Sequence, residues 1–226
     1  CACKPPGGIV ALPSTIGGRA QDCRTSAIIL SSLARFRVPA PLVVGTLLAI
    51  AAAPYLAGGV LGAYFAGDDF QWLYAATALG WERGFDVSSR SSSYRPVIDL
   101  WFTAGYVVCD RSSACYHAAS LIVHLFAVAM VFVLAKTLFR DVRIAALGTA
   151  LFAMQPAYTQ AVAWVAAIPN TLGAALLLAA LLAQTRSWQP QSPTRQRAWE
   201  IASIALFFLA VFAHEASIVL LAVTVL

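Results

Sequence analysis

Long apolar stretches without a charged residue constrain this chain more than any other feature. One runs from Val38 to Gly67, and others cover 118–135, 144–185 and 201–213. Only 11% of the 226 residues are charged, whereas soluble domains carry ~25%. Because a helix needs ~20 predominantly apolar residues to cross a bilayer, the sequence predicts an all-α, polytopic membrane protein.

The membrane domain is expected to cover 38–226 as a bundle of about six transmembrane helices. Two helical stretches with charged ends, 71–81 and 95–108, fit better as surface helices within one long outer loop, 68–115. Residues 1–37 are rich in Gly, Pro and Ser, which predicts a disordered cytoplasmic lead-in. The expected spans are 39–66, 116–138, 144–158, 167–185, 200–213 and 216–226.

The two ends of the chain predict a part of a longer protein. The chain begins at Cys1 rather than Met and stops at Leu226 inside an apolar run. We therefore expect the membrane domain to be incomplete at its C-terminus, and no clear signal peptide precedes it. A processed lipoprotein would also begin with Cys, but it would place 1–37 outside the cell, against the charge distribution.

The charge distribution predicts the orientation. Basic residues form short clusters rather than one continuous face, which argues against a nucleic-acid partner despite a net charge of +5. Basic residues favour the cytoplasmic side of short loops. With the N-terminus inside, most of the 15 Lys and Arg residues are cytoplasmic, and Asp68, Asp69 and Glu215 face outward. The expected location is a bacterial inner membrane with the active face outward. The cytoplasmic basic residues are then Lys4, Arg19, Arg24, Arg35, Arg37, Lys136, Arg140, Arg143, Arg186, Arg195 and Arg197.

Cysteine positions agree with this orientation. Cys109 and Cys115 flank the sequence DRSSA in the outer loop, where an oxidising compartment permits a disulfide. A bridge and two free thiols are both open at this point. Cys1, Cys3 and Cys23 would be cytoplasmic and reduced. No cysteine has metal-ligand spacing with a histidine, so the sequence indicates no metal site and no cofactor, although it leaves a divalent cation open.

Asp68 and Asp69 stand side by side where the first apolar segment ends. One interpretation is that they mark the water interface and cap the following helix, whose N-terminus favours negative charge. The other is catalytic: one carboxylate acts as general base, and the second orients it or a ligand. Both interpretations stay open.

Other polar residues interrupt the apolar pattern toward the same outer face. Arg95 precedes a proline that suits the first turn of a helix, and it would hold a phosphate bidentately or reach the lipid head groups. His214 and Glu215 separate two apolar runs, either as an interfacial turn or as ligand contacts, and Glu215 is a candidate partner of Arg95. His117, near the outer end of its span, is a ligand candidate, whereas the deeper His124 is more typical of a packing residue.

The order of these features resembles the N-terminal part of the GT-C superfamily of polytopic glycosyltransferases. The branch is the one related to protein O-mannosyltransferases and the transmembrane-and-TPR mannosyltransferases. The resemblance covers about residues 40–226. It rests on the Asp pair after the first span, "YRPVIDLWF" in the outer loop, "YHAASLIVH" in the second span, and then "AVAW" and "AHE" in order.

This resemblance implies an activity and a set of site residues. In that family, a carboxylate of the first outer loop deprotonates the acceptor hydroxyl, and a polyprenyl-phosphate donor supplies the sugar. The implied function is transfer of a sugar to a protein or glycan acceptor at the outer membrane face. The implied roles are Asp68 as base, Asp69 as its neighbour, Arg95 as donor-phosphate contact, and His117, Trp164, His214 and Glu215 as further substrate-binding residues.

Two other functions stay open. A polytopic transporter would also carry charges within the membrane, although this chain has no internal repeat and its charges lie toward one face. A catalytically inactive relative that acts as a membrane scaffold is the second, because 155–160 and 167–170 depart from the residues usual in the family.

Overall fold

The computed structural model describes residues 39–84 and 94–218, which form helices and no strand. This confirms the all-α fold class. The expected lead-in at 1–37 lies outside the described residues, as does most of the last expected span, 216–226. The α-helices are α2 (Ala40–Ala57), α3 (Asp69–Leu79), α4 (Pro96–Cys109), α5 (Ser113–Phe139), α6 (Val142–Ala153), α7 (Ala157–Ala163), α8 (Ile168–Ser187) and α9 (Pro193–Ala213). Short 3-10 helices are η1 (Val60–Gly62), η2 (Gly80–Gly84), η3 (Val165–Ala167) and η4 (Glu215–Ile218).

Four helices in the described part of the chain are long and apolar enough to cross a membrane. They are α2, α5, α8 together with η3, and α9. The protein is therefore an integral, multi-pass membrane protein, as predicted. The expected surface stretches 71–81 and 95–108 also form helices, α3 and α4.

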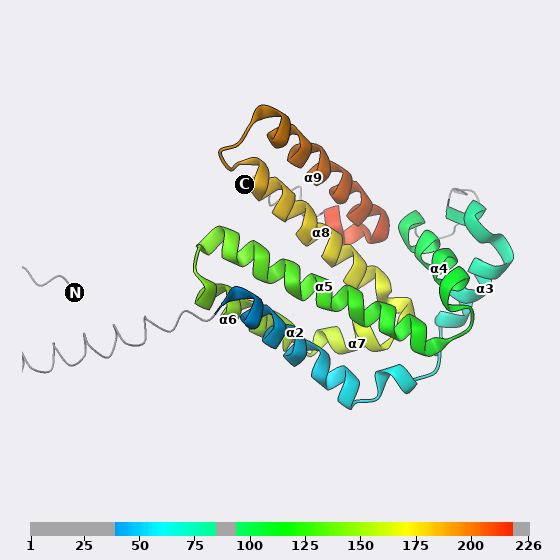
Figure 1. Cartoon of the computed structure of the whole chain (residues 1–226). Helices are drawn as coiled ribbons and strands as arrows, with labels where there is room; N and C mark the ends of the chain where they lie inside the picture. The colour runs from blue at the N-terminus through cyan, green and yellow to red at the C-terminus, as the bar shows by residue number, and fades with distance from the viewer. Residues whose placement is uncertain (1–38, 85–93, 219–226) are drawn as a thin grey trace, which may run out of the picture. The chain divides into compact units, whose positions relative to one another are not determined.

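The expected span 144–158 differs from the prediction, because it is split into two short helices. Helix α6 has 12 residues, too few to cross a bilayer alone. It ends ahead of Pro156, since a proline disfavours helical backbone in the residue before it. Helix α7 then resumes the path and leads to the start of α8 (Figure 1). Both short helices pack against α5, whereas Met154, Gln155 and Pro156 at the break between them are exposed.

Helix α8 is central to the bundle, since it packs against both α5 and α9 (Figure 1). Its buried positions include Gly173, Ala175, Ala180 and Ala183. Small residues let transmembrane helices approach closely, because lipid supplies no hydrophobic drive for helix association. The hydroxyl of Ser203 on α9 donates to the Ala180 carbonyl at 3.0 Å and adds an interhelical hydrogen bond.

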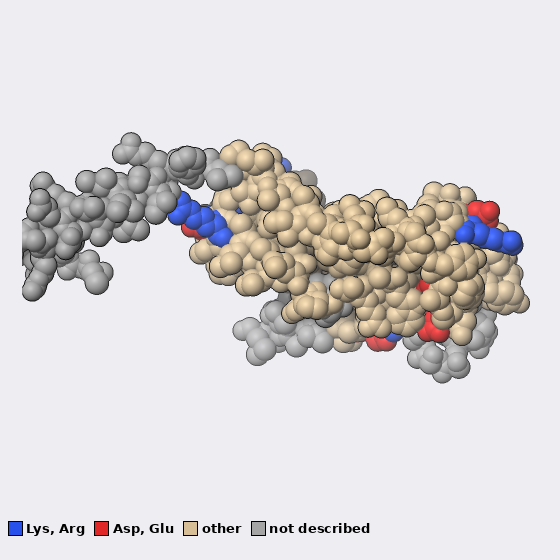
Figure 2. Space-filling view, turned by 90° about the horizontal axis from the view of Figure 1, so that it is seen from below, with Lys and Arg blue, Asp and Glu red and all other residues tan. Residues whose placement is uncertain are grey.

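The bundle has two ends that carry different side chains. At one, called here the Asp69 end, a single hydrophobic cluster joins six elements and includes Phe65, Phe102, Tyr116, Val165 and Ala213. At the other, the Lys136 end, the start of α2 meets the last turns of α5 and α8. Figure 2 shows one face of the molecule, on which the charged side chains gather toward the ends and leave a broad uncharged middle. This distribution suits a segment surrounded by lipid.

A disulfide fixes the connection between α4 and α5 at the Asp69 end. Cys109 and Cys115 are bonded, with their Cα atoms 5.5 Å apart. The pairing that the sequence left open is therefore confirmed. It holds the C-terminus of α4 beside the first turn of α5, the helix that carries His117.

Candidate functional site

Asp69 is a buried anchor rather than a free carboxylate. Its side chain is 1% exposed, and it accepts hydrogen bonds from two backbone N–H groups. Ala66, just before α3, donates to Oδ2 at 2.9 Å. Ala166, in η3, donates to Oδ1 at 2.6 Å. Asp69 therefore fastens the start of α3 to the turn that precedes α8.

Asp68 differs from its neighbour in both exposure and bonding. It occupies the position just before α3, and its side chain is exposed and makes no capping hydrogen bond. The interpretation that the Asp68 side chain caps the helix is therefore wrong. The backbone carbonyl of Asp68 instead accepts hydrogen bonds from the N–H groups of Gln71 and Trp72. Gly67 has φ +54°, which suits glycine and turns the chain sharply before the pair. Of the two carboxylates, Asp68 is the one that a substrate can reach.

Arg95 and Glu215 form a bidentate ion pair. The Arg95 Nε–H donates to Glu215 Oε2 at 2.8 Å, and Nη2–H donates to Oε1 at 2.6 Å. These hydrogen bonds hold the pKa of Glu215 at about 2, below its ordinary 4.5. The pair uses one edge of the guanidinium, which has five N–H donors in all. Its Nη1 donors have no partner among the described residues.

His214 closes α9 beside this ion pair. Its Nδ1 accepts the backbone N–H of Ala216 at 3.1 Å, so a neutral His214 carries its proton on Nε2. The His214 Cβ lies against α8, where a Cβ added at Gly173 would meet it at 2.9 Å. A pocket of about 210 Å³ lies beside it, lined also by Asn170 and Ser217. Sequence reasoning did not select these last two residues, and no motif would have marked them.

His117 lies near Asp69 on the first turns of α5. It is 1% exposed, and neither ring nitrogen has a hydrogen-bond partner within the described ranges. The Asp69 carboxylate acts on the ring electrostatically, and the backbone of Ala63 lies close to it without a well-formed hydrogen bond. Ser120, one turn further along α5, is equally buried and its hydroxyl is also unpartnered among the described residues. Buried polar groups are ordinarily satisfied, so these two are candidates to contact a ligand or an ordered water.

Trp164 takes an extended conformation between α7 and η3 and is half-buried. It precedes by two residues Ala166, whose backbone N–H reaches Asp69. The structure thus places Trp164 at the Asp69 end, two residues before the N–H group that bonds Asp69.

The sequence-predicted site residues all lie at the Asp69 end, in two groups. One group is Asp68, Asp69, His117 and Trp164, and the second is Arg95, His214 and Glu215. The hydrophobic cluster beneath them explains this placement, because its members Tyr116, Val165 and Ala213 directly adjoin His117, Trp164 and His214 in the chain. Among the described residues, no hydrogen bond or ion pair joins a residue of the first group to a residue of the second.

Metal coordination is a separate question for these side chains. In residues 39–84 and 94–218, no group of three or more His, Cys, Asp and Glu side chains is placed to hold a metal ion.

Known proteins with similar sequences support the resemblance. The chain is 31% identical to the human protein O-mannosyl-transferase TMTC3 over 119 residues, which is 53% of this chain and 13% of that protein. It is 30% identical to the mouse protein O-mannosyl-transferase TMTC1 over 122 residues, or 54% of this chain and 13% of the relative. A protein O-mannosyl-transferase of Caenorhabditis elegans is 32% identical over 110 residues, 47% of this chain and 16% of its own length.

The extent of these matches is limited. The chain spans about an eighth of the length of the curated relatives it matches. No protein-family model matches it, and no solved structure matches it. Over about half of its own length, this membrane-embedded chain is therefore similar to protein O-mannosyl-transferases, as its sequence motifs predicted.

Proposed function

We propose that this chain belongs to a membrane glycosyltransferase that moves a sugar, mannose by analogy with the relatives, from a polyprenyl-phosphate donor to an acceptor hydroxyl. The acceptor is a protein or a glycan, and the reaction takes place at the outer face of a bacterial inner membrane. The observation that carries the proposal is the division between two adjacent carboxylates: Asp69 is buried and fixed by two backbone N–H groups, and Asp68 is exposed beside it.

This division suits a general base and its support. Asp68 takes the proton of the acceptor hydroxyl, and the acceptor oxygen bonds to the anomeric carbon of the sugar. The bond from that carbon to the phosphate oxygen breaks, and polyprenyl phosphate leaves with the electron pair. Since Asp69 holds the start of α3 against η3, the backbone that carries Asp68 is fixed, which favours catalysis by a positioned group.

Arg95 is the proposed contact for the donor phosphate. Glu215 occupies one edge of its guanidinium and so fixes the direction of the other edge. Phosphate oxygens accept parallel N–H bonds from such a planar fork. A phosphate leaves with little help from a general acid, and in this proposal Arg95 offsets the negative charge that the phosphate gains, so the proposal includes no metal ion and no other cofactor. His117, Trp164 and His214 are proposed to line the substrate path.

The test is sugar transfer by the full-length protein carrying Asp68→Asn. Asparagine keeps the size of the side chain but takes no proton near neutral pH. General base catalysis contributes about 10²–10⁴-fold, so we expect transfer to fall by that factor while donor binding stays the same. Gln71→Ala, an exposed change in the same helix, is the matched control. Full transfer by Asp68→Asn would rule out this base.

A further inference from the structure

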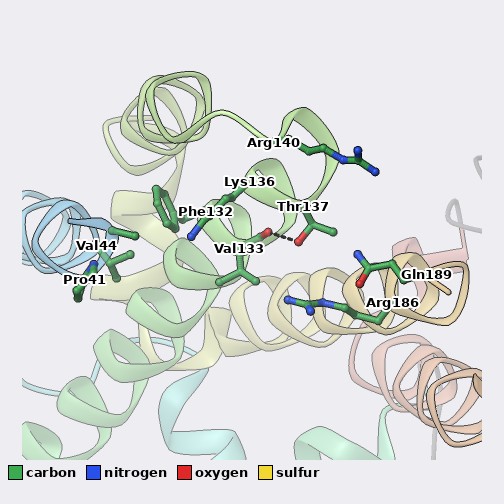
Figure 3. Close-up of a pocket in the computed structure, with 10 residues that line it drawn as sticks. Pro41, Val44, Phe132, Val133, Lys136, Thr137, Arg140, Arg186 and Gln189 are labelled. Atoms are coloured by element: carbon green, nitrogen blue, oxygen red, sulfur yellow. Dashed lines mark hydrogen bonds between the residues drawn. The ribbon is translucent and has the colours of Figure 1, made fainter. Parts of the chain in front are cut away.

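A second pocket lies at the Lys136 end, opposite the candidate catalytic site. Its volume is about 570 Å³, and residues of three helices line it. Figure 3 shows these side chains around the space between the start of α2 and the last turns of α5 and α8. The lining residues are Ala40, Pro41, Val44, Phe132, Val133, Lys136, Thr137, Arg140, Arg186 and Gln189.

The pocket carries positive charge and no carboxylate. Lys136, Arg140 and Arg186 all line it, and none of these three side chains has a hydrogen-bond or ion-pair partner among the described residues. In Figure 3 the Lys136 ammonium and the Arg186 guanidinium are directed toward the pocket, whereas Arg140 points away. The adjacent Asp141 does not line the pocket, and its Oδ1 accepts the backbone N–H groups of Arg143 and Ile144 at the start of α6.

Helix ends add little to this attraction. The N-terminus of α2 favours an anion, but the C-terminal ends of α5 and α8 carry the opposite partial charge. The attraction for an anion therefore depends on the side chains of Lys136 and Arg186.

The apolar part of the lining decides between a soluble anion and a lipid. Phe132 and Val133 lie one turn further from the end of α5 than Lys136, and Val44 lies one turn inside the start of α2. These apolar side chains continue into the transmembrane surface. A cationic rim at the helix ends above an apolar wall matches a molecule with an anionic head and a hydrocarbon tail. Basic pockets between transmembrane helices bind such head groups.

We propose that the pocket at the Lys136 end binds the head group of an anionic phospholipid, with Lys136 and Arg186 contacting the phosphate. The bound lipid belongs to the leaflet opposite the candidate catalytic residues. This site is independent of the proposed sugar transfer, because none of its residues lies at the Asp69 end.

The experiment is native mass spectrometry of the full-length protein, purified in neutral detergent and titrated with dioleoyl phosphatidylglycerol. Chain-matched dioleoyl phosphatidylcholine is the lipid control. We expect saturable binding of the anionic lipid and no saturable binding of the zwitterionic one. The variant Lys136→Gln/Arg186→Gln should weaken binding of the anionic lipid about 25-fold, since each basic residue near a membrane surface is worth about fivefold.

Two comparisons keep the result interpretable. Arg195→Gln removes an exposed positive charge that lies outside the pocket, and it should leave the affinity unchanged. The melting temperature of each variant without lipid shows whether the variant is folded. The single variant Lys136→Arg keeps the positive charge, so it should bind the anionic lipid as tightly as the wild type does. Equal weakening by Arg195→Gln would overturn the proposal, because it would indicate a general charge effect. Displacement of the lipid by millimolar inorganic phosphate would overturn the lipid assignment in favour of a soluble anion.

Discussion

Arg95 and Glu215, 120 residues apart in the chain, are joined by two hydrogen bonds of 2.8 and 2.6 Å. The pair links the residue before α4 to the turn that follows α9. Arg95 is mostly shielded, with 22% of its side chain exposed, whereas Glu215 is 62% exposed. A pair this open to solvent contributes little to stability, so its main physical effect is to hold the guanidinium in one direction.

The first prediction concerns the pH dependence of this pair. The pKa of Glu215 is lowered from 4.5 to about 2 by the hydrogen bonds from Arg95. Because the pKa of Glu215 is lower in the folded chain than in the unfolded chain, the ionised carboxylate stabilises the fold at pH values above 4.5. This stabilisation is lost as the pH falls from 4.5 toward 2. The difference in melting temperature between the wild type and Glu215→Gln should therefore be constant above pH 4.5 and shrink below it. A difference that persists unchanged at pH 2 would show that the ion pair does not cause it.

The second prediction separates the two adjacent carboxylates by stability. Asp69→Asn places an NH₂ group against one of the two backbone N–H donors that Asp69 now accepts. A buried donor left without an acceptor costs about 1–3 kcal/mol, so unfolding should become easier by that amount. Asp68→Asn is exposed and should change stability by less than about 0.5 kcal/mol. Denaturant unfolding in detergent measures both, and equal effects at the two positions would contradict the anchoring role.

Apolar length and residue type predicted much of this architecture. The charge-free stretches predicted the four long helices. The orientation of the chain permitted a bond between Cys109 and Cys115 but left it open, and the structure shows it. Glu215 was a candidate partner of Arg95 because a carboxylate between apolar runs needs a counter-ion, and the structure confirms the pair. These features depend on local composition and on few partners.

Features that depend on distant backbone could not be predicted in this way. Asp68 and Asp69 are chemically identical, and the donor that distinguishes them, the Ala166 N–H, is 97 residues away. Helices α6 and α7 each pack against α5, and the residue pattern of 144–158 contains no sign of that contact. The pocket at the Lys136 end gathers side chains from three helices, and no single segment contains a motif for it.

The third prediction tests which ends of the helices face outward. Ala78 on α3 and Gln189 after α8 are both exposed and lie at opposite ends of the bundle. In a background with Cys1, Cys3 and Cys23 changed to Ser, Ala78→Cys should react with a membrane-impermeant maleimide in sealed, right-side-out vesicles. Gln189→Cys should react only after permeabilisation, because basic residues favour the cytoplasmic side. The reverse pattern would move the candidate catalytic site to the cytoplasm.

The last prediction concerns the free edge of Arg95 and rests on the proposed sugar transfer. Arg95→Lys keeps the positive charge but replaces the planar fork with a single ammonium. Lysine cannot bond Glu215 and a phosphate with the same two-edged geometry, so one charge-assisted contact is lost. A hydrogen bond to a charged group is worth about 1.5–3 kcal/mol, and we therefore expect the KM for the lipid-phosphate donor to rise about tenfold or more. Arg195→Lys, the same change at an exposed position on α9, should leave this KM unchanged. If Arg95→Lys lowers kcat without changing the donor KM, Arg95 acts on the transition state rather than on donor binding, and its role as a ground-state phosphate contact is wrong.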